Sequence, residues 1–147
     1  MIVGVTGTRN GATADQIRWA RSYFERLSKQ KSIHYLVHGC ALGADEQMAV
    51  EAYSYGFLIG GHPSNNDYWT SDKAKSLCYV MAKSLPPLQR NLNIIHACEV
   101  LLAFPASDHE ELRSGTWMTI RSAAKEFKRT IICWPGGDIE YIPNSYK

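Results

Sequence analysis

Short apolar runs alternate with amphipathic stretches along most of the chain. Each run is bounded by glycine, proline or a polar turn, which is typical of a buried strand in a parallel sheet. Residues 1–6 show the pattern clearly, because a β-branched run there ends at Gly7 and a turn-rich loop follows. The pattern predicts five strands in all, at residues 1–6, 34–38, 57–61, 99–104 and 130–134.

The stretches between these runs carry apolar residues at helical spacing. In the first stretch, Thr13 and Gln16 have the spacing of a capping box, and the apolar positions after them recur every three or four residues. Gly56 is placed to end the second helix as a C-cap glycine. We predict further helices at about 71–83, at 89–98 and at 116–127, and a polar tail after Gly137.

The alternation of strands and helices predicts the fold class. It implies an α/β protein with a mainly parallel sheet that helices cover on both faces. Right-handed crossovers place every strand-to-helix loop at one edge of such a sheet, and ligands bind beyond the carboxyl ends of its strands. A chain of 147 residues suits one domain, so we expect residues 1–147 to form a single unit.

Composition and charge narrow the class of protein. Hydrophobic residues make up 45% of the chain and charged residues 20%, as in an ordinary globular core. The net charge of +2 is too small to indicate a nucleic-acid surface by itself, and we expect neither a signal peptide nor a membrane span. Four cysteines lie far apart without a C-x-x-C pair, so we expect reduced thiols, a cytoplasmic setting and no metal site.

The clearest candidate for chemistry is the point where the loop after the fourth predicted strand becomes a helix. Ser114, Gly115 and Thr116 stand there, with Arg113 directly before them. The start of a helix leaves backbone N–H groups without partners and carries the positive end of the dipole. Because Gly115 has no Cβ, an anion can approach those amides closely, so the stretch indicates a phosphate site. The alternative interpretation is that Ser114 or Thr116 only caps the helix.

Other candidates stand in the loops at the same predicted edge. Arg9 can hold a phosphate through two parallel hydrogen bonds, or it can be a solvated surface residue. Asp45 can accept hydrogen bonds from ribose hydroxyls, or it can cap a helix, and the glycines can equally serve tight turns. Tyr68 and Trp69 suit either stacking on a base or packing of their own loop. The ligand-binding candidates from these loops are Gly7, Thr8, Arg9, Gly39, Gly43, Ala44, Asp45, His62, Arg90 and Asn91.

Three motifs share their order along the chain with a known superfamily. Residues 38–45 form a glycine-rich loop after the second strand, and Arg90 and Asn91 are followed by two isoleucines. Residues 114–116 precede an amphipathic helix and a Pro-Gly-Gly turn. Together these motifs resemble the SLOG superfamily, which includes the DNA-processing protein A domain, LOG-type phosphoribohydrolases and small phage and bacterial proteins of unassigned role. The resemblance implies a three-layer Rossmann-like fold with five strands or slightly more, and a homodimer.

One departure from the family pattern bears on activity. LOG-type enzymes carry a glutamate three residues past the threonine of the last motif, whereas this chain has Thr119 at that position. Because threonine carries no charge to stabilise an oxocarbenium-like state, we do not expect hydrolysis of a glycosidic bond by that route. Glu111 and Asp45 are the remaining candidates for a rearranged catalytic acid.

These observations favour a protein that binds a nucleotide or a nucleotide-derived small molecule, with no metal or other cofactor. We expect phosphates on residues 114–116 and on the first loop, and a ribose near Gly43 and Asp45. One alternative is a nucleotide N-glycosidase, and another is a module that binds single-stranded DNA. The modest net charge argues against nucleic acid as a partner. A third alternative is a scaffold whose pocket has lost its ligand.

Overall fold

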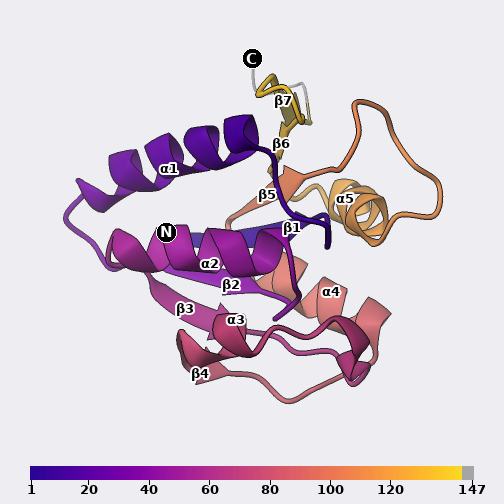
Figure 1. The fold of residues 1–147 in the computed structure, drawn as a ribbon, viewed down its shortest axis with the longest axis horizontal. Coiled ribbons are helices and arrows are strands. Elements are labelled where there is room, and N and C mark those ends of the chain that lie inside the picture. The colour runs from indigo at the N-terminus through magenta and orange to yellow at the C-terminus, as the bar shows by residue number, and fades with distance from the viewer. Residues whose placement is uncertain (144–147) are drawn as a thin grey trace.

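The computed structural model describes residues 1–143 and shows one mixed sheet between two layers of helices (Figure 1). The strands are β1 (Ile2–Gly7), β2 (Tyr35–His38), β3 (Leu58–Gly61), β4 (Cys78–Met81), β5 (Val100–Phe104), β6 (Thr130–Cys133) and β7 (Ile139–Ile142). Their order across the sheet is β4-β3-β2-β1-β5-β6-β7, and every neighbouring pair is parallel except β6 and β7. The predicted α/β, three-layer Rossmann-like fold is confirmed, with seven strands.

The helices cover both faces of the sheet. They are α1 (Ala14–Ser28), α2 (Ala44–Ser54), α3 (Asp72–Ser76), α4 (Pro87–Ala97) and α5 (Gly115–Lys125), with a 3-10 turn, η1, at Asp67–Trp69. α1, α2 and α3 lie on one face, where Phe24, Met48 and Phe104 belong to the larger apolar core. α4 and α5 lie on the other face, over Leu101 and Ile132. Because both faces are covered, all five residues of β5 are buried.

Two predictions for the edges of the sheet are wrong. The helix predicted at 71–83 ends at Ser76 as α3, and Cys78–Met81 forms the edge strand β4. The tail after Gly137 contains β7, which pairs antiparallel with β6. Edge strands have one partner and one solvated side, so their sequences lack the continuous apolar run that marks a central strand. Three of the four residues of β4 are accordingly exposed.

The start of α1 is tied to the ends of two central strands by one buried amide. Thr13 and Gln16 form the predicted capping box, in which each side chain accepts a hydrogen bond from the other residue's backbone N–H. The Nε2 of Gln16 donates to the carbonyl oxygens of Pro105, at 2.9 Å, and Cys133, at 2.8 Å. The carbonyl groups just past β5 and at the end of β6 are therefore satisfied by α1.

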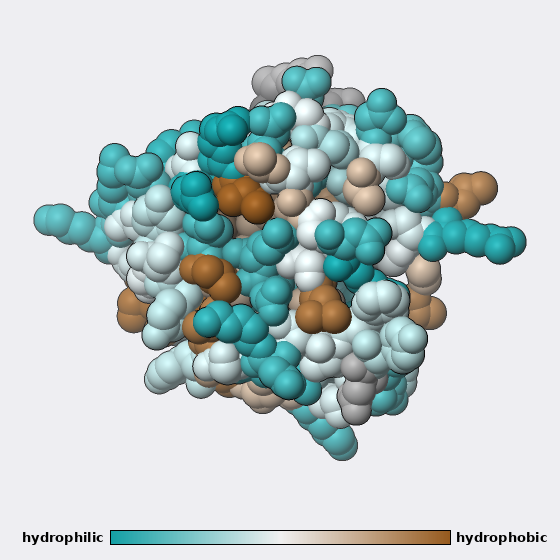
Figure 2. Space-filling model, in the orientation of Figure 1, coloured by the Kyte–Doolittle hydropathy of each residue, from teal (hydrophilic) through white to brown (hydrophobic). Residues whose placement is uncertain are grey.

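The surface is mixed in character over the face shown in Figure 2, where hydrophobic atoms form separate small patches among hydrophilic ones. Scattered apolar residues of this kind are normal on a folded chain. No helix within residues 1–143 combines the length and the apolar character needed to cross a lipid bilayer.

Candidate functional site

A cleft of about 610 Å³ opens beyond the carboxyl ends of β1 and β5. The loop after β1, the long segment between β5 and α5, and η1 gather on this side of the molecule, at the right of Figure 1. The start of α4 and the first turn of α5 complete the walls. Most of the residues predicted from sequence line this cleft: Gly7, Thr8, Arg9, Gly39, Asp45, Arg90, Asn91, Glu111, Arg113, Ser114, Gly115 and Thr116.

The first turn of α5 presents open backbone to the cleft. Ser114 is the N-cap, and its Oγ accepts a hydrogen bond from the N–H of Trp117 at 3.3 Å, so the capping interpretation holds for this residue. Within residues 1–143, the amides of Gly115 and Thr116 have no hydrogen-bond partner. A Cβ built on Gly115 would meet nothing within 4 Å. The positive end of the helix thus faces free space inside the cleft.

The loop after β1 forms the facing wall. Thr8 is held in place, because its N–H donates to the carbonyl of Phe104 at 3.0 Å and its Oγ1 accepts from the N–H of Asn10 at 3.1 Å. The guanidinium carbon of Arg9 lies 5.3 Å from the centroid of the Trp69 ring, which is a cation–π contact. Since both residues line the cleft, this wall offers a positive charge beside an aromatic face.

The end of the glycine-rich loop, at Gly43 and Ala44 before α2, is covered by the backbone of the loop after β1 rather than open to the cleft. Gly43 has a φ of +83°, and a Cβ there would collide with the carbonyl of Thr8 and the backbone of Arg9. The N–H of Ala44 donates to the carbonyl of Thr8 at 2.9 Å. Gly43 and Ala44 are not among the residues that line the cleft. The tight-turn interpretation therefore describes Gly43.

A buried network fixes the peptide of Gly39 from both sides. The Oδ2 of Asp45 accepts hydrogen bonds from the N–H of Gly39, at 2.9 Å, and of Ala41, at 3.2 Å. The Nη1 of Arg90 donates to the carbonyl oxygens of Gly39, at 2.6 Å, and of His62, at 3.2 Å. Burial raises the pKa of Asp45, while His38 and Arg90 act in the opposite direction. Asp45 therefore holds the loop with its Oδ2, and it also lines the cleft.

The same network includes Arg90 and Asn91 of α4 and the backbone of His62, which follows β3. The Nε of Arg90 donates to Oδ1 of Asn91 at 2.8 Å, so the two residues act together at the cleft wall. Burial lowers the pKa of Arg90, and the charge of Asp45 acts in the opposite direction. His62 is half-buried and does not line the cleft, and burial lowers the pKa of its imidazole. Its carbonyl oxygen, rather than its ring, contributes to the site.

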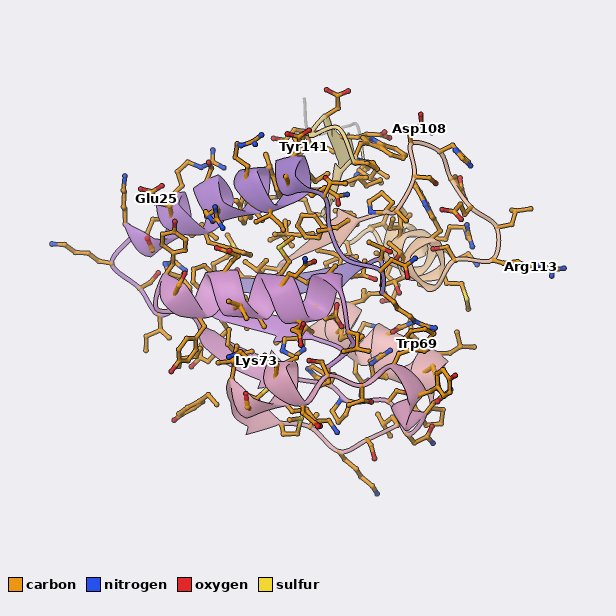
Figure 3. All side chains as sticks on the ribbon, in the orientation of Figure 1. Glu25, Trp69, Lys73, Asp108, Arg113 and Tyr141 are labelled. Carbon is orange, nitrogen blue, oxygen red and sulfur yellow. The ribbon has the colours of Figure 1, made fainter. Side chains whose placement is uncertain are left out.

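Arg113 and Glu111, between β5 and α5, differ in the direction and the contacts of their side chains. Arg113 borders the cleft, but its side chain is exposed and extends away from the molecule at the right of Figure 3. Glu111 lines the cleft, and its Oε1 accepts a hydrogen bond from Oγ of Ser107 at 2.7 Å. Thr119 is buried at the cleft and donates to the carbonyl of Gly115 at 3.1 Å. The position of the LOG-type glutamate thus holds a neutral hydroxyl that already has a partner.

The sequence did not identify several residues of the cleft wall. Asn10, Ala41 and Ile94 line it, as does Met118 on the first turns of α5. Met118 lies four residues after Ser114, so the helical period was the signal that could have placed it on the same face. Trp69, which the sequence suggested for stacking, lines the cleft and is 40% exposed.

A second hollow of about 870 Å³ lies between the segment after β5 and the β6–β7 hairpin. Its lining includes Asp108, Asp138 and Glu140, together with Trp134 and Gly136. Three carboxylates make this hollow unsuitable for a phosphate, because like charges repel. The two hollows therefore differ in the sign of the charge that they favour.

No protein-family model matches the chain, and no curated protein matches it either. Several solved structures are similar over most of its length. A molybdenum cofactor binding protein from Rippkaea orientalis has a TM-score of 0.66 at 22% identity, with 90% of this chain and 76% of that chain covered. DNA processing protein A from Streptococcus pneumoniae has a TM-score of 0.67 at 19% identity, with coverage of 88% and 49%. This chain therefore spans about half the length of the second protein.

A third similar structure concerns the single-stranded DNA binding mode of DNA processing protein A from Helicobacter pylori. Its TM-score is 0.63 at 19% identity, with 90% of this chain and 64% of that chain covered. Two of the three structures are thus DNA processing proteins, so the expectation that nucleic acid is not a partner finds no support. At these identities the likeness concerns the fold alone. The chain therefore has the Rossmann-like fold of these proteins.

Proposed function

We propose that the protein binds a nucleotide or a nucleotide-derived small molecule in the 610 Å³ cleft, with a phosphate group on the first turn of α5. The observation that carries this proposal is the pair of unpartnered amides at Gly115 and Thr116, two residues that line the cleft, with open space at the Cβ position of Gly115. A phosphate there would accept hydrogen bonds from these amides and meet the positive end of the helix dipole.

The facing wall supports the same ligand class. Arg9 adds a guanidinium that can pair with phosphate oxygens, and the free face of Trp69 suits a planar ring system. The volume is within the range of small-molecule and cofactor sites. The likeness to a molybdenum cofactor binding protein adds that this fold holds a small molecule in at least one neighbour.

The test uses a charge reversal at an open position. Gly115→Asp puts a carboxylate where the phosphate is expected, and the open space around Gly115 means that packing is unaffected. An acidic residue in the first turn also suits the helix dipole, so stability should stay constant or rise. Gly136→Asp is the matched control, because Gly136 is equally open but lies in the acidic hollow.

The measurement is calorimetric titration and thermal shift with nucleoside mono-, di- and triphosphates and with inorganic phosphate. We expect at least one nucleotide to bind wild-type protein and Gly136→Asp equally, and Gly115→Asp to bind it more than about tenfold less tightly. Equal binding by all three proteins would show that the phosphate does not lie on α5. The absence of a thermal shift with every phosphate compound would favour the scaffold alternative.

Single-stranded DNA is a second candidate, and an exposed aromatic pair favours it. Tyr68 is 81% exposed and packs edge-on against Trp69, with 5.3 Å between ring centroids. Exposed aromatic rings beside a basic residue suit stacking of successive bases. Fluorescence anisotropy with a labelled oligonucleotide tests this, and Tyr68→Ala should weaken binding about tenfold or more if a base stacks there. Unchanged anisotropy with wild-type protein would remove this candidate.

We also propose that the protein forms a homodimer. The edge strand β4 exposes Tyr79, Val80 and Met81 by 73%, 56% and 42%. An apolar edge strand is a liability in a monomer, because its free backbone groups can pair with another strand. Light scattering measures the mass in solution, and a mass of one 16.5 kDa chain would contradict the dimer.

A further inference from the structure

Three sulfur atoms converge beside Gly61, the last residue of β3: those of Cys40, just past β2, and of Cys78 and Met81, the two ends of β4. The Sγ atoms of Cys40 and Cys78 and the Sδ of Met81 all lie within 2.9 Å of the point where a Cβ of Gly61 would be. The Sγ of Cys40 donates to Sδ of Met81 at 3.8 Å, and the Sγ of Cys78 donates to the carbonyl oxygen of Ala74 at 3.3 Å. Gly61 is therefore the residue that leaves room for this cluster.

His38 orients its ring toward the same cluster. Its Nδ1 accepts a hydrogen bond from the N–H of Cys40 at 2.9 Å, so the proton of the neutral ring is on Nε2. Nε2 lies 3.9 Å from Sγ of Cys78 and points its N–H at that sulfur. The neighbouring Cys40 lowers the pKa of the Cys78 thiol and His38 lowers it further, whereas burial acts in the opposite direction. The neighbouring Cys78 and burial both raise the pKa of Cys40.

We propose that Cys78 is a peroxide-reactive thiolate and that Cys40 resolves its oxidised form to an intramolecular disulfide. In the first step, the Cys78 thiolate attacks one oxygen of a hydroperoxide, the O–O bond breaks, and water or an alcohol leaves as a sulfenic acid forms on Cys78. In the second step, Cys40 loses its proton and attacks the Cys78 sulfur, and the sulfenic oxygen leaves as water. The two thiols are oxidised and the hydroperoxide is reduced.

The exposure of the two sulfurs suits this order of events. Cys78 is half-buried on the edge strand β4, so a small peroxide can reach it, whereas Cys40 is buried directly beside it. Two thiols that approach each other in a reducing compartment are typical of a transient or sensing disulfide.

The remaining cysteines provide an internal control. Cys98 and Cys133 are buried and have no second thiol beside them. Burial raises the pKa of Cys98 to about 11 and that of Cys133 to about 12. Because the thiolate is the form that reacts, both are expected to resist oxidation under conditions that oxidise Cys78.

The experiment treats the full chain with hydrogen peroxide, alkylates the free thiols under denaturing conditions and maps the peptides by mass spectrometry. We expect a Cys40–Cys78 disulfide, with Cys98 and Cys133 alkylated. Cys40→Ser should stop at a sulfenic acid on Cys78, which dimedone traps, and Cys98→Ser should behave as wild type. An untouched Cys78, or a disulfide that includes Cys98 or Cys133, would overturn the proposal.

A second measurement does not depend on whether the variants fold. Native wild-type protein is alkylated with iodoacetamide at pH 6.5, where an ordinary thiol is almost entirely protonated. Cys78 should react at least about ten times faster than Cys98 and Cys133, because its thiolate is favoured. Equal or slower alkylation of Cys78 would contradict the thiolate on which the proposal depends, whatever binds in the cleft.

Discussion

Two regions at the carboxyl ends of the strands, one at the start of α5 and one at the start of α2, look alike in sequence and differ in structure. We refer to them as the two halves of this edge of the sheet. Both halves have glycines where a strand or loop leads into a helix. Around Gly115, at the start of α5, the backbone amides are unpartnered and the space is open. Around Gly43, at the start of α2, the backbone of Thr8 and Arg9 occupies the space and accepts the hydrogen bond.

The difference shows that a glycine-rich loop does not by itself mark a place for a ligand. In the half around β2, glycine allows the protein's own backbone and the Arg90 guanidinium to approach Gly39 and Gly43 closely. In the half around β5, the same residue type leaves a helix terminus uncovered. The first half thus builds the wall, and the second half is the part that can receive an anion.

The largest effect is expected where the backbone closes the loop. Gly43→Ala should lower the free energy of unfolding by about 3 kcal/mol, because the new Cβ meets backbone atoms and the positive φ strains a side-chain-bearing residue. Gly115→Ala is the matched change at the open glycine, and it should stay within about 1 kcal/mol of wild type or be more stable. Urea unfolding measures both. Similar losses at the two glycines would remove the contrast between the two halves.

A smaller loss of stability is expected when the wall loses its arginine. Arg90→Met should destabilise the protein by about 2 kcal/mol, because it leaves the Gly39 carbonyl without this donor and removes the positive charge that favours ionised Asp45 in its buried position. Arg18→Met is the control, since Arg18 is exposed and its pair with Asp15 is worth no more than about 0.5 kcal/mol. If thermal or urea unfolding shows no difference between the two variants, Arg90 does not support the loop.

The smallest expected effect is on nucleotide affinity, and it concerns Arg9 and Arg113 at the border of the cleft. Arg9→Ala should weaken nucleotide binding about fivefold in low salt and less in 0.5 M salt, because a charge within the cleft is lost. Arg113→Ala should change the affinity by less than about twofold at any salt, since its side chain is exposed and extends away. Calorimetric titration at two salt concentrations decides the order, and a larger effect at Arg113 would reverse it.

The central strands were predictable because a strand that is buried on both faces has a continuous run of apolar residues. β1 and β5 are such runs, and the capping box of Thr13 and Gln16 predicts where α1 begins. β4 and β7 were missed because they are edge strands. Exposed Tyr79, Val80 and Met81 in β4 follow directly on a helical turn, so the local pattern could not separate helix from strand.

The candidate site was predictable in location but not in detail. The rule that parallel strands end at one edge placed Thr8, Arg9, Arg90 and Thr116 at a common cleft, as the structure shows. The sequence did not reveal that the amide of Ala44 is already bonded, because the partner carbonyl belongs to a loop far away in the chain. The sequence also did not reveal that Cys40 and Cys78 lie close together, because Cys78 belongs to β4, a strand that was not predicted.

The side chain of Gln16 also determines where this chain tolerates a change in length. By holding the carbonyl oxygens of Pro105 and Cys133, it anchors the point at which the segment toward α5 leaves the sheet. Ser114 anchors the other end as the helix cap. Residues inserted between these anchors, for example after the exposed Asp108, would lengthen a surface loop and leave strand register unchanged. The segment is therefore a natural place to carry a reporter tag.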